Sequence, residues 1–239
     1  MLKRRPRRGR FEVSPQPDDV SCGPTCLHAV YRYYGDDVPL EQIIEEVVPL
    51  DTGGTLAVSL ACHALRRGYD ATIYTYNLLI FDPSWFAKDA GVDIAARLRA
   101  QRQTKSDRKL HAATRLYLEF LERGGKLAYE DLRPALIRRF LKSGVPILTG
   151  CSATYLYECP RELEDVSDDV RGAPVGHFVV VVDYDQRKRE VRVADPLHEH
   201  PRFQSHYYRV PVERLIGAIL LGIVTYDANL LLITPRERG

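Results

Sequence analysis

The chain of 239 residues has no long hydrophobic run, only a small net charge, and no internal repeat or low-complexity tract. Its longest apolar stretch, residues 215–226, is far shorter than the ~20 residues of a membrane-spanning helix and is interrupted by Gly217 and Gly222. The formal charge of +2 comes from interspersed acids and bases, so composition gives no argument for a nucleic-acid or membrane partner. These absences leave a soluble globular protein that is large enough to bury one substantial core.

Cysteine is also scarce, with five residues in the whole chain. An odd number of cysteines in a long chain favours free thiols over a disulfide framework. The arginines near the start are followed by FEVSPQPDD, where an export signal would need an apolar run of ~7–15 residues. We therefore expect no export signal and a location in the reducing cytoplasm.

Charge is uneven only at the N-terminus, where residues 1–12 are expected to form a flexible tail. Such a tail could touch phosphates or an acidic partner, but a solvated arm is the favoured interpretation, and we expect no nucleic-acid partner. The basic residues of this tail are Lys3, Arg4, Arg5, Arg7, Arg8 and Arg10.

Hydrophobic periodicity predicts an α+β protein, with helices first and a mostly antiparallel sheet second. Thr55 is a candidate N-cap for the third helix, and an acidic loop is expected at 162–169. We expect one domain at 13–239, with a helical insertion or lid, rather than core, at about 77–125, although amphipathic spacing in its second helix predicts that it packs on another part of the protein. Helices are predicted at 25–34, 39–48, 56–67, 92–101, 110–122, 129–143 and 211–218. Strands are predicted at 70–76, 146–157, 177–185, 190–195 and 229–234.

The chain is organised around residues 16–35, QPDDVSCGPTCLHAVYRYYG. Cys22 follows a turn-rich run and opens an apolar segment of helical period. A cysteine in the first turn of a helix meets the positive end of the helix dipole, which favours the nucleophilic thiolate. Gln16, six residues upstream, could donate its amide to a developing oxyanion beside the Cys22 backbone N–H.

A base and an orienting group for this cysteine are found later in the chain. His177 opens the strand GHFVVVVDYD, where a buried and rigid sheet end suits a general base. Asp195 ends the next strand, after a turn of hairpin type. Antiparallel pairing of these strands would bring Asp195 within reach of the His177 ring, where it could fix the tautomer.

The other four cysteines are not expected to be the nucleophile. Cys26 lies one helical turn further in and is more readily explained as a buried residue. Cys62 falls within a helix, where packing is its expected role. Cys151 and Cys159 flank an extended stretch and could line a cleft.

Three histidines near Asp195 raise the possibility of a zinc site. His198 and His200 lie on one side of an extended segment, and His206 follows. No cysteine or carboxylate cluster accompanies them, so a metal site is the less favoured interpretation and no metal or cofactor is expected.

Taken together, these motifs resemble a papain-like cysteine peptidase of the bacteriocin-processing, or double-glycine leader, peptidase family. The matching segments are Gln16 with Cys22, CGPTCLHAVYRYYG, GHFVVVVDYD and VADP. The resemblance implies a papain-like fold, in which the nucleophile helix packs on a C-terminal antiparallel sheet. It also implies roles for four residues: Cys22 as nucleophile, His177 as base, Asp195 as orienter and Gln16 as oxyanion donor.

The resulting hypothesis is a cysteine peptidase that hydrolyses a peptide or isopeptide bond in a peptide or protein substrate through an acyl-enzyme. Two alternatives remain open. An acyltransferase or transpeptidase would form the same acyl-enzyme and pass it to an amine. A non-catalytic peptide-binding module on the same scaffold would not need the four residues together.

Overall fold

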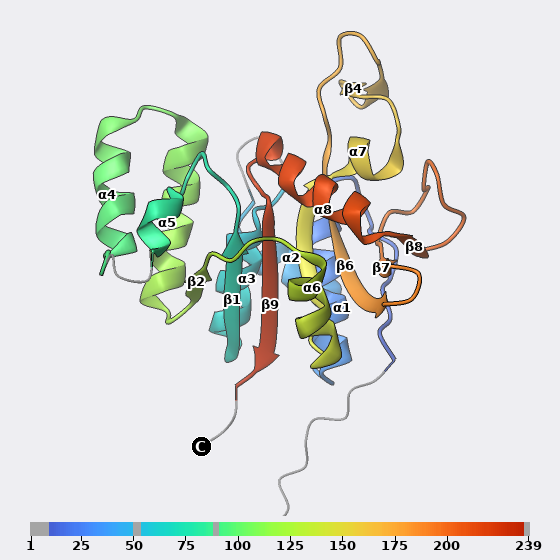
Figure 1. Cartoon of the computed structure of the whole chain (residues 1–239), viewed down its shortest axis with the longest axis horizontal. Helices are drawn as coiled ribbons and strands as arrows, with labels where there is room; N and C mark the ends of the chain where they lie inside the picture. The colour runs from blue at the N-terminus through green and yellow to red at the C-terminus, as the bar shows by residue number, and fades with distance from the viewer. Residues whose placement is uncertain (1–9, 50–53, 88–90, 237–239) are drawn as a thin grey trace, which may run out of the picture.

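The computed structural model describes residues 10–49, 54–87 and 91–236, so nearly all of the basic tail predicted at the N-terminus lies outside the described residues. A seven-stranded sheet in the order β2-β1-β9-β3-β6-β7-β8 forms the centre of the molecule (Figure 1). Only the β1–β2 pair is parallel, and the other neighbouring pairs are antiparallel, as the sequence predicts. The strands are β1 (Tyr69–Thr75), β2 (Lys126–Ala128), β3 (Ile147–Ser152), β6 (Gly176–Asp185), β7 (Glu190–Ala194), β8 (Tyr207–Pro211) and β9 (Asn229–Pro235).

Two hydrophobic clusters cover the two faces of this sheet, and alternate residues of β6 contribute to each. Phe178 and Val180 belong to one cluster, whereas Val179 and Val181 belong to the other. This alternation follows from the two-residue period of a strand and explains why the run of valines is buried on both sides. The first cluster includes α1 (Cys22–Tyr33), α2 (Leu40–Glu46), α3 (Ala57–Arg66), α4 (Ile94–Thr104) and α5 (Arg108–Glu122). The second includes α6 (Pro134–Lys142), α7 (Ala153–Tyr157) and α8 (Val212–Leu221).

The helical segment at 77–125 is packed into the first cluster. Leu98 of α4 and Phe120 of α5 are fully buried, and Gln101 donates a hydrogen bond to the carbonyl of Ile80. In Figure 1, α4 and α5 lie at the β2 edge of the sheet. The interpretation of this segment as a lid rather than core is therefore wrong, whereas the packing predicted from the amphipathic spacing of α5 is confirmed. The amphipathic face of α5 supplies core side chains because α3 leaves an apolar surface for it to cover.

Three local predictions are also wrong. The strand expected at 146–157 ends at Ser152, whose side chain accepts from the N–H of Tyr155 and so starts α7. The acidic loop expected at 162–169 contains a small hairpin of β4 (Glu162–Leu163) and β5 (Val166–Ser167). Thr55 does not cap α3, because the carboxylate of Asp227 takes the N–H of Ala57 instead.

Two short helical turns complete the described chain, η1 (Pro83–Phe86) and η2 (Gly222–Thr225). None of the helices within the described residues has both the length and the apolar character that crossing a membrane would require.

Candidate active site

Cys22 is the first residue of α1 and is partly exposed, whereas the next five residues are buried. The start of the helix is pressed against the sheet, since a Cβ at Gly23 would lie 3.3 Å from both Leu60 and Phe178. Glycine at this position therefore lets the helix N-terminus approach β6. The thiol is held at the end of the helix where unpaired backbone N–H groups accumulate.

Three other cysteines are buried, and burial disfavours their ionised forms. Burial raises the pKa of both Cys26 and Cys151 well above the ordinary value, and it raises the pKa of Cys62 to about 12. Cys26 donates to the carbonyl of Phe178 and Cys151 to that of His177. Cys151 therefore does not line a cleft as an exposed thiol, contrary to the prediction, whereas Cys159 is partly exposed.

His177 is the second residue of β6 and is directly opposite Cys151 of β3 in the sheet. Its Nε2 atom lies 2.8 Å from Oδ1 of Asp195. Because Nε2 is occupied by Asp195, Nδ1 is the ring nitrogen left for a second partner, and Cys22 is close enough to act on the pKa of the imidazole. Burial by itself would lower the pKa of His177, but the Asp195 carboxylate and the Cys22 thiol outweigh it and raise the pKa to about 10.

The predicted hairpin register explains how Asp195 reaches this histidine. Val180 of β6 pairs with Ala194 of β7, so the residue after Ala194 continues toward the start of β6. Asp195 is fully buried at this position. Burial alone would raise the pKa of its carboxyl, but His177 and the hydrogen-bond donors around it hold the pKa well below the ordinary value.

Several groups that the sequence analysis did not assign to the site surround this carboxylate. Oδ1 accepts from the backbone N–H of Leu197 as well as from His177. Oδ2 accepts from the hydroxyls of Tyr157 and Tyr208, each at 2.7 Å, and from Nε2 of His200 at 3.3 Å. No local pattern identifies the two tyrosines, because they come from α7 and β8 and meet only in the folded chain.

The histidines considered as zinc ligands contact Asp195 in a different way. His200 donates to the side chain, and Nδ1 of His206 donates to the Asp195 backbone carbonyl at 2.9 Å. Within residues 10–49, 54–87 and 91–236, no group of three or more metal-ligating side chains is arranged to hold an ion.

Gln16 is buried and is fixed at both its backbone and its side chain. Its N–H donates to the carbonyl of Pro196 at 2.8 Å, and its Nε2 donates to the carbonyl of Asp18 at 2.8 Å. The second N–H of the Nε2 amide group is left for another acceptor. The Asp18 carboxylate accepts in turn from Val20 and Ser21, which fixes the turn that leads into α1.

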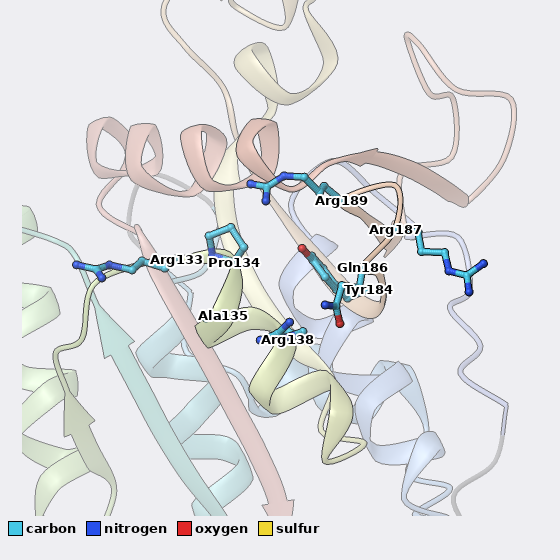
Figure 2. A pocket seen from close by; sticks show the side chains of 8 residues that line it. All are labelled: Arg133, Pro134, Ala135, Arg138, Tyr184, Gln186, Arg187 and Arg189. Atoms are coloured by element: carbon cyan, nitrogen blue, oxygen red, sulfur yellow. The ribbon is translucent and has the colours of Figure 1, made fainter.

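A cavity of about 530 Å³ lies at the other end of β6, where the β6–β7 turn faces the start of α6 (Figure 2). The candidate active-site residues do not line it. In Figure 2, the side chains of Arg133 and Arg187 point away from one another, toward opposite sides of the cavity. The lining residues are Arg133, Pro134, Ala135, Arg138, Tyr184, Gln186, Arg187 and Arg189.

Solved structures are similar to this chain in fold. A candidate C39-like peptidase from Bacillus anthracis has a TM-score of 0.52 and 15% identity, and the match covers 96% of each chain. The peptidase domain of Streptococcus ComA, a bifunctional ABC transporter of a quorum-sensing pathway, has a TM-score of 0.46 and 12% identity over 95% of this chain and 99% of that one. A double-glycine motif protease from an AMS/PCAT transporter, in complex with the leader peptide, has a TM-score of 0.45 and 16% identity over 96% of each chain.

The likeness to the Bacillus anthracis structure confirms the predicted α+β, papain-like fold. At 15% identity it extends to the fold alone, and the two structures with TM-scores below 0.5 add nothing to it. No protein-family model matches the chain, and the comparison with curated proteins found no match.

Proposed function

We propose that this protein is a cysteine peptidase that hydrolyses a peptide or isopeptide bond. In this proposal Cys22 is the nucleophile, His177 the acid and base, Asp195 the orienting carboxylate and Gln16 an oxyanion donor. One observation carries the proposal: a buried imidazole lies 2.8 Å from a buried carboxylate and within electrostatic reach of the thiol at the start of α1. This is the arrangement that nucleophilic catalysis by a thiol requires.

The electrostatics favour an ion pair between Cys22 and His177. With a pKa of about 10, the His177 imidazole keeps its second proton through the neutral range. The proton held there can come from the Cys22 thiol, which then attacks as a thiolate. Asp195 supports this state because it is a buried carboxylate next to the imidazolium.

Acyl transfer to the thiol then follows in balanced steps. The Cys22 thiolate forms a C–S bond to the substrate carbonyl, whose oxygen becomes an oxyanion. The free N–H of the Gln16 amide and the backbone N–H of Cys22, which has no intrahelical acceptor, are the donors proposed for that oxyanion. His177 gives its proton to the leaving amine as the C–N bond breaks.

Hydrolysis of the thioester completes the cycle. Neutral His177 removes a proton from water, and the resulting hydroxide attacks the acyl carbon. The C–S bond breaks to release the carboxylic acid and restore the thiolate beside the imidazolium. Since all five cysteines are free, we propose that the protein works in the reducing cytoplasm, where Cys22 stays a thiol.

Intact-mass measurement of alkylation by iodoacetamide near neutral pH tests the nucleophile. We expect fast single-site modification of Cys22, and its loss in Cys22→Ala and strong slowing in His177→Ala. Cys159→Ala is the matched control, because Cys159 is the other partly exposed cysteine. Slow and equal labelling of several cysteines would contradict the proposal.

Cleavage of a peptide library tests the reaction. We expect Cys22-dependent cleavage products with free carboxyl ends. Products in which the acyl group has moved to an added amine, forming faster than hydrolysis, would instead identify an acyltransferase.

A further inference from the structure

The carboxylate of Asp195 is held by more donors than its contact with His177 requires. The group formed by Tyr157, His200 and Tyr208, here called the Oδ2 cage, donates to the oxygen that does not face His177. The other oxygen, Oδ1, accepts one hydrogen bond from the backbone N–H of Leu197 at 2.9 Å and a second from His177. An ionised carboxylate offers about four lone-pair directions, and five donors converge on this one, so its rotation is fixed from both oxygens.

His200 is the member of the cage whose protonation can be read from its contacts. Its Nδ1 atom accepts from the backbone N–H groups of Arg202 and Phe203, at 3.2 and 3.1 Å. A nitrogen that accepts carries no hydrogen, so the ring N–H that these contacts assign is on Nε2. That proton is directed at Asp195 Oδ2.

The loop that carries His200 is held against the same side of the site. Arg202 in this loop forms an ion pair with Glu158, the residue after Tyr157. The His200 ring packs edge-on against Tyr157 with centroids 4.2 Å apart. Phe203 stacks on Tyr208 at 3.9 Å, so both tyrosines of the cage are packed by the loop. The side chain of His200 is almost fully buried as a result.

We propose that His200 is a positioning residue of the candidate active site, which donates from Nε2 to Asp195 Oδ2 and keeps Oδ1 turned toward His177. This inference rests on the proposed function, since it concerns how His177 is oriented toward Cys22. Without the His200 donor, Oδ2 is held only by the two tyrosine hydroxyls, whose O–H groups can rotate, so the carboxylate turns more easily away from Nε2 of His177. The imidazole is then less firmly held in the orientation that pairs Nδ1 with the thiol.

Two substitutions at His200 separate its hydrogen bond from its packing. His200→Phe keeps a planar ring among the aromatic neighbours but removes the donor. His200→Gln keeps an N–H donor of similar reach without the ring. Phe203→Leu is the matched control, because it loosens the packing of the same loop and removes no donor to Asp195.

The readout is the rate of Cys22 alkylation by iodoacetamide from pH 5 to pH 9, with thermal unfolding measured in parallel. Charge-assisted hydrogen bonds are the stronger class, so we expect His200→Phe to slow alkylation at pH 6 about tenfold. We expect His200→Gln to stay within about threefold of the parent protein, since it restores the donor. Phe203→Leu should unfold at a lower temperature but be alkylated at the parent rate below that temperature.

The inference is overturned if His200→Phe is alkylated at the parent rate while folded, or if Phe203→Leu slows alkylation as much as His200→Phe does. The first result would make the contact dispensable, and the second would make packing the cause. If the parent protein itself shows no selective alkylation of Cys22, the proposed function fails instead. The two failures are therefore distinguishable in one set of measurements.

Discussion

The backbone N–H of Gln16 donates to the carbonyl of Pro196 at 2.8 Å. This single bond joins the segment before the Cys22 helix to the residue that follows Asp195. The candidate oxyanion donor and the candidate orienting carboxylate are thus fixed within one hydrogen-bonded unit, although they come from opposite halves of the chain. A shift of either segment would therefore displace both Gln16 and Asp195.

Gln16→Ala is expected to lower kcat by about 10²–10³ if its amide stabilises the oxyanion, the range found for loss of one such donor. The backbone bond to Pro196 does not depend on the side chain. The substitution removes the Nε2 hydrogen bond to Asp18 but also removes the buried and unpartnered Oε1 atom, so stability should fall by no more than about 1 kcal/mol. Peptide hydrolysis and thermal unfolding measure the two effects.

Alkylation of Cys22 is the control for this variant, since iodoacetamide forms no oxyanion. An unchanged alkylation rate with reduced hydrolysis would support the oxyanion role. Equal loss of both would mean that Gln16 shapes the thiol site instead.

Asp195→Asn is expected to lower the pKa of His177 below the ordinary value of about 6.5. The reason is that burial would remain while the carboxylate that opposes it is gone. The side-chain amide of asparagine is also a poorer partner for the three donors that now contact Oδ2 of the carboxylate. We therefore expect the variant to lose about 3 kcal/mol of unfolding free energy. Titration of the imidazole by NMR and chemical denaturation check the two parts. A pKa that stays near 10 in the variant would contradict the assigned cause.

The stability of the parent protein should fall as pH rises from about 8.5 to about 10. In this window the unfolded chain has released the protons of both His177 and Cys22, whereas the folded ion pair keeps one proton on His177, so the folded state binds more protons. The slope in this window is at most about 1.4 kcal/mol per pH unit, and the contribution is lost by about pH 10. Denaturation series at several pH values measure the slope, and Asp195→Asn should lack this component. If Asp195→Asn shows the same fall of unfolding free energy with pH as the parent protein, a group other than His177 causes that fall.

Asp227→Asn is expected to stabilise the protein above pH 7 and to leave it unchanged near pH 4. Burial raises the pKa of the Asp227 carboxyl to about 7, so the folded state holds a proton between about pH 3.8 and 7 that the unfolded chain releases. The parent protein therefore loses stability across that window, by roughly 2–4 kcal/mol, and a neutral amide does not. Asparagine keeps the oxygen that accepts from Ala57 and brings a donor for the unpaired Asn229 Oδ1.

Asp183→Asn is the matched control for that prediction, because Asp183 is exposed and forms a surface ion pair with Arg209. We expect no comparable change in its pH dependence. Equal stability of the parent and Asp227→Asn at pH 8 would show that the buried carboxyl is not the destabilising group.

Much of the candidate site follows from local patterns in the sequence. Helical periodicity places Cys22 at the start of α1, and the hairpin of β6 and β7 brings Asp195 to His177. A helix start and a two-strand hairpin are set by residues that are close in sequence, so their geometry can be worked out without the rest of the fold.

Other parts of the fold were mispredicted because a capping side chain or a distant residue overrides the intrinsic preference of the segment. The ATYLY segment is rich in residues typical of strands, yet Ser152 caps it as α7. Thr55 is a good capping residue, but at the start of α3 the side chain of Asp227 accepts the hydrogen bond from the N–H of Ala57 instead. The face of α5 that looked like part of a lid is buried because α3 lies against it.

Periodicity and hairpin register, which are local properties, predicted by themselves an α+β protein and the proposed grouping of Cys22, His177 and Asp195, and the resemblance of the motifs to a known family implied the papain-like architecture. Only the tertiary structure decided what surrounds Asp195. Tyr157, His200 and Tyr208 come from a helix, a loop and an edge strand, and no spacing in the chain marks them as partners. Their convergence has a physical cause: a fully buried carboxylate must be satisfied by donors, and the fold supplies them from whichever segments meet there.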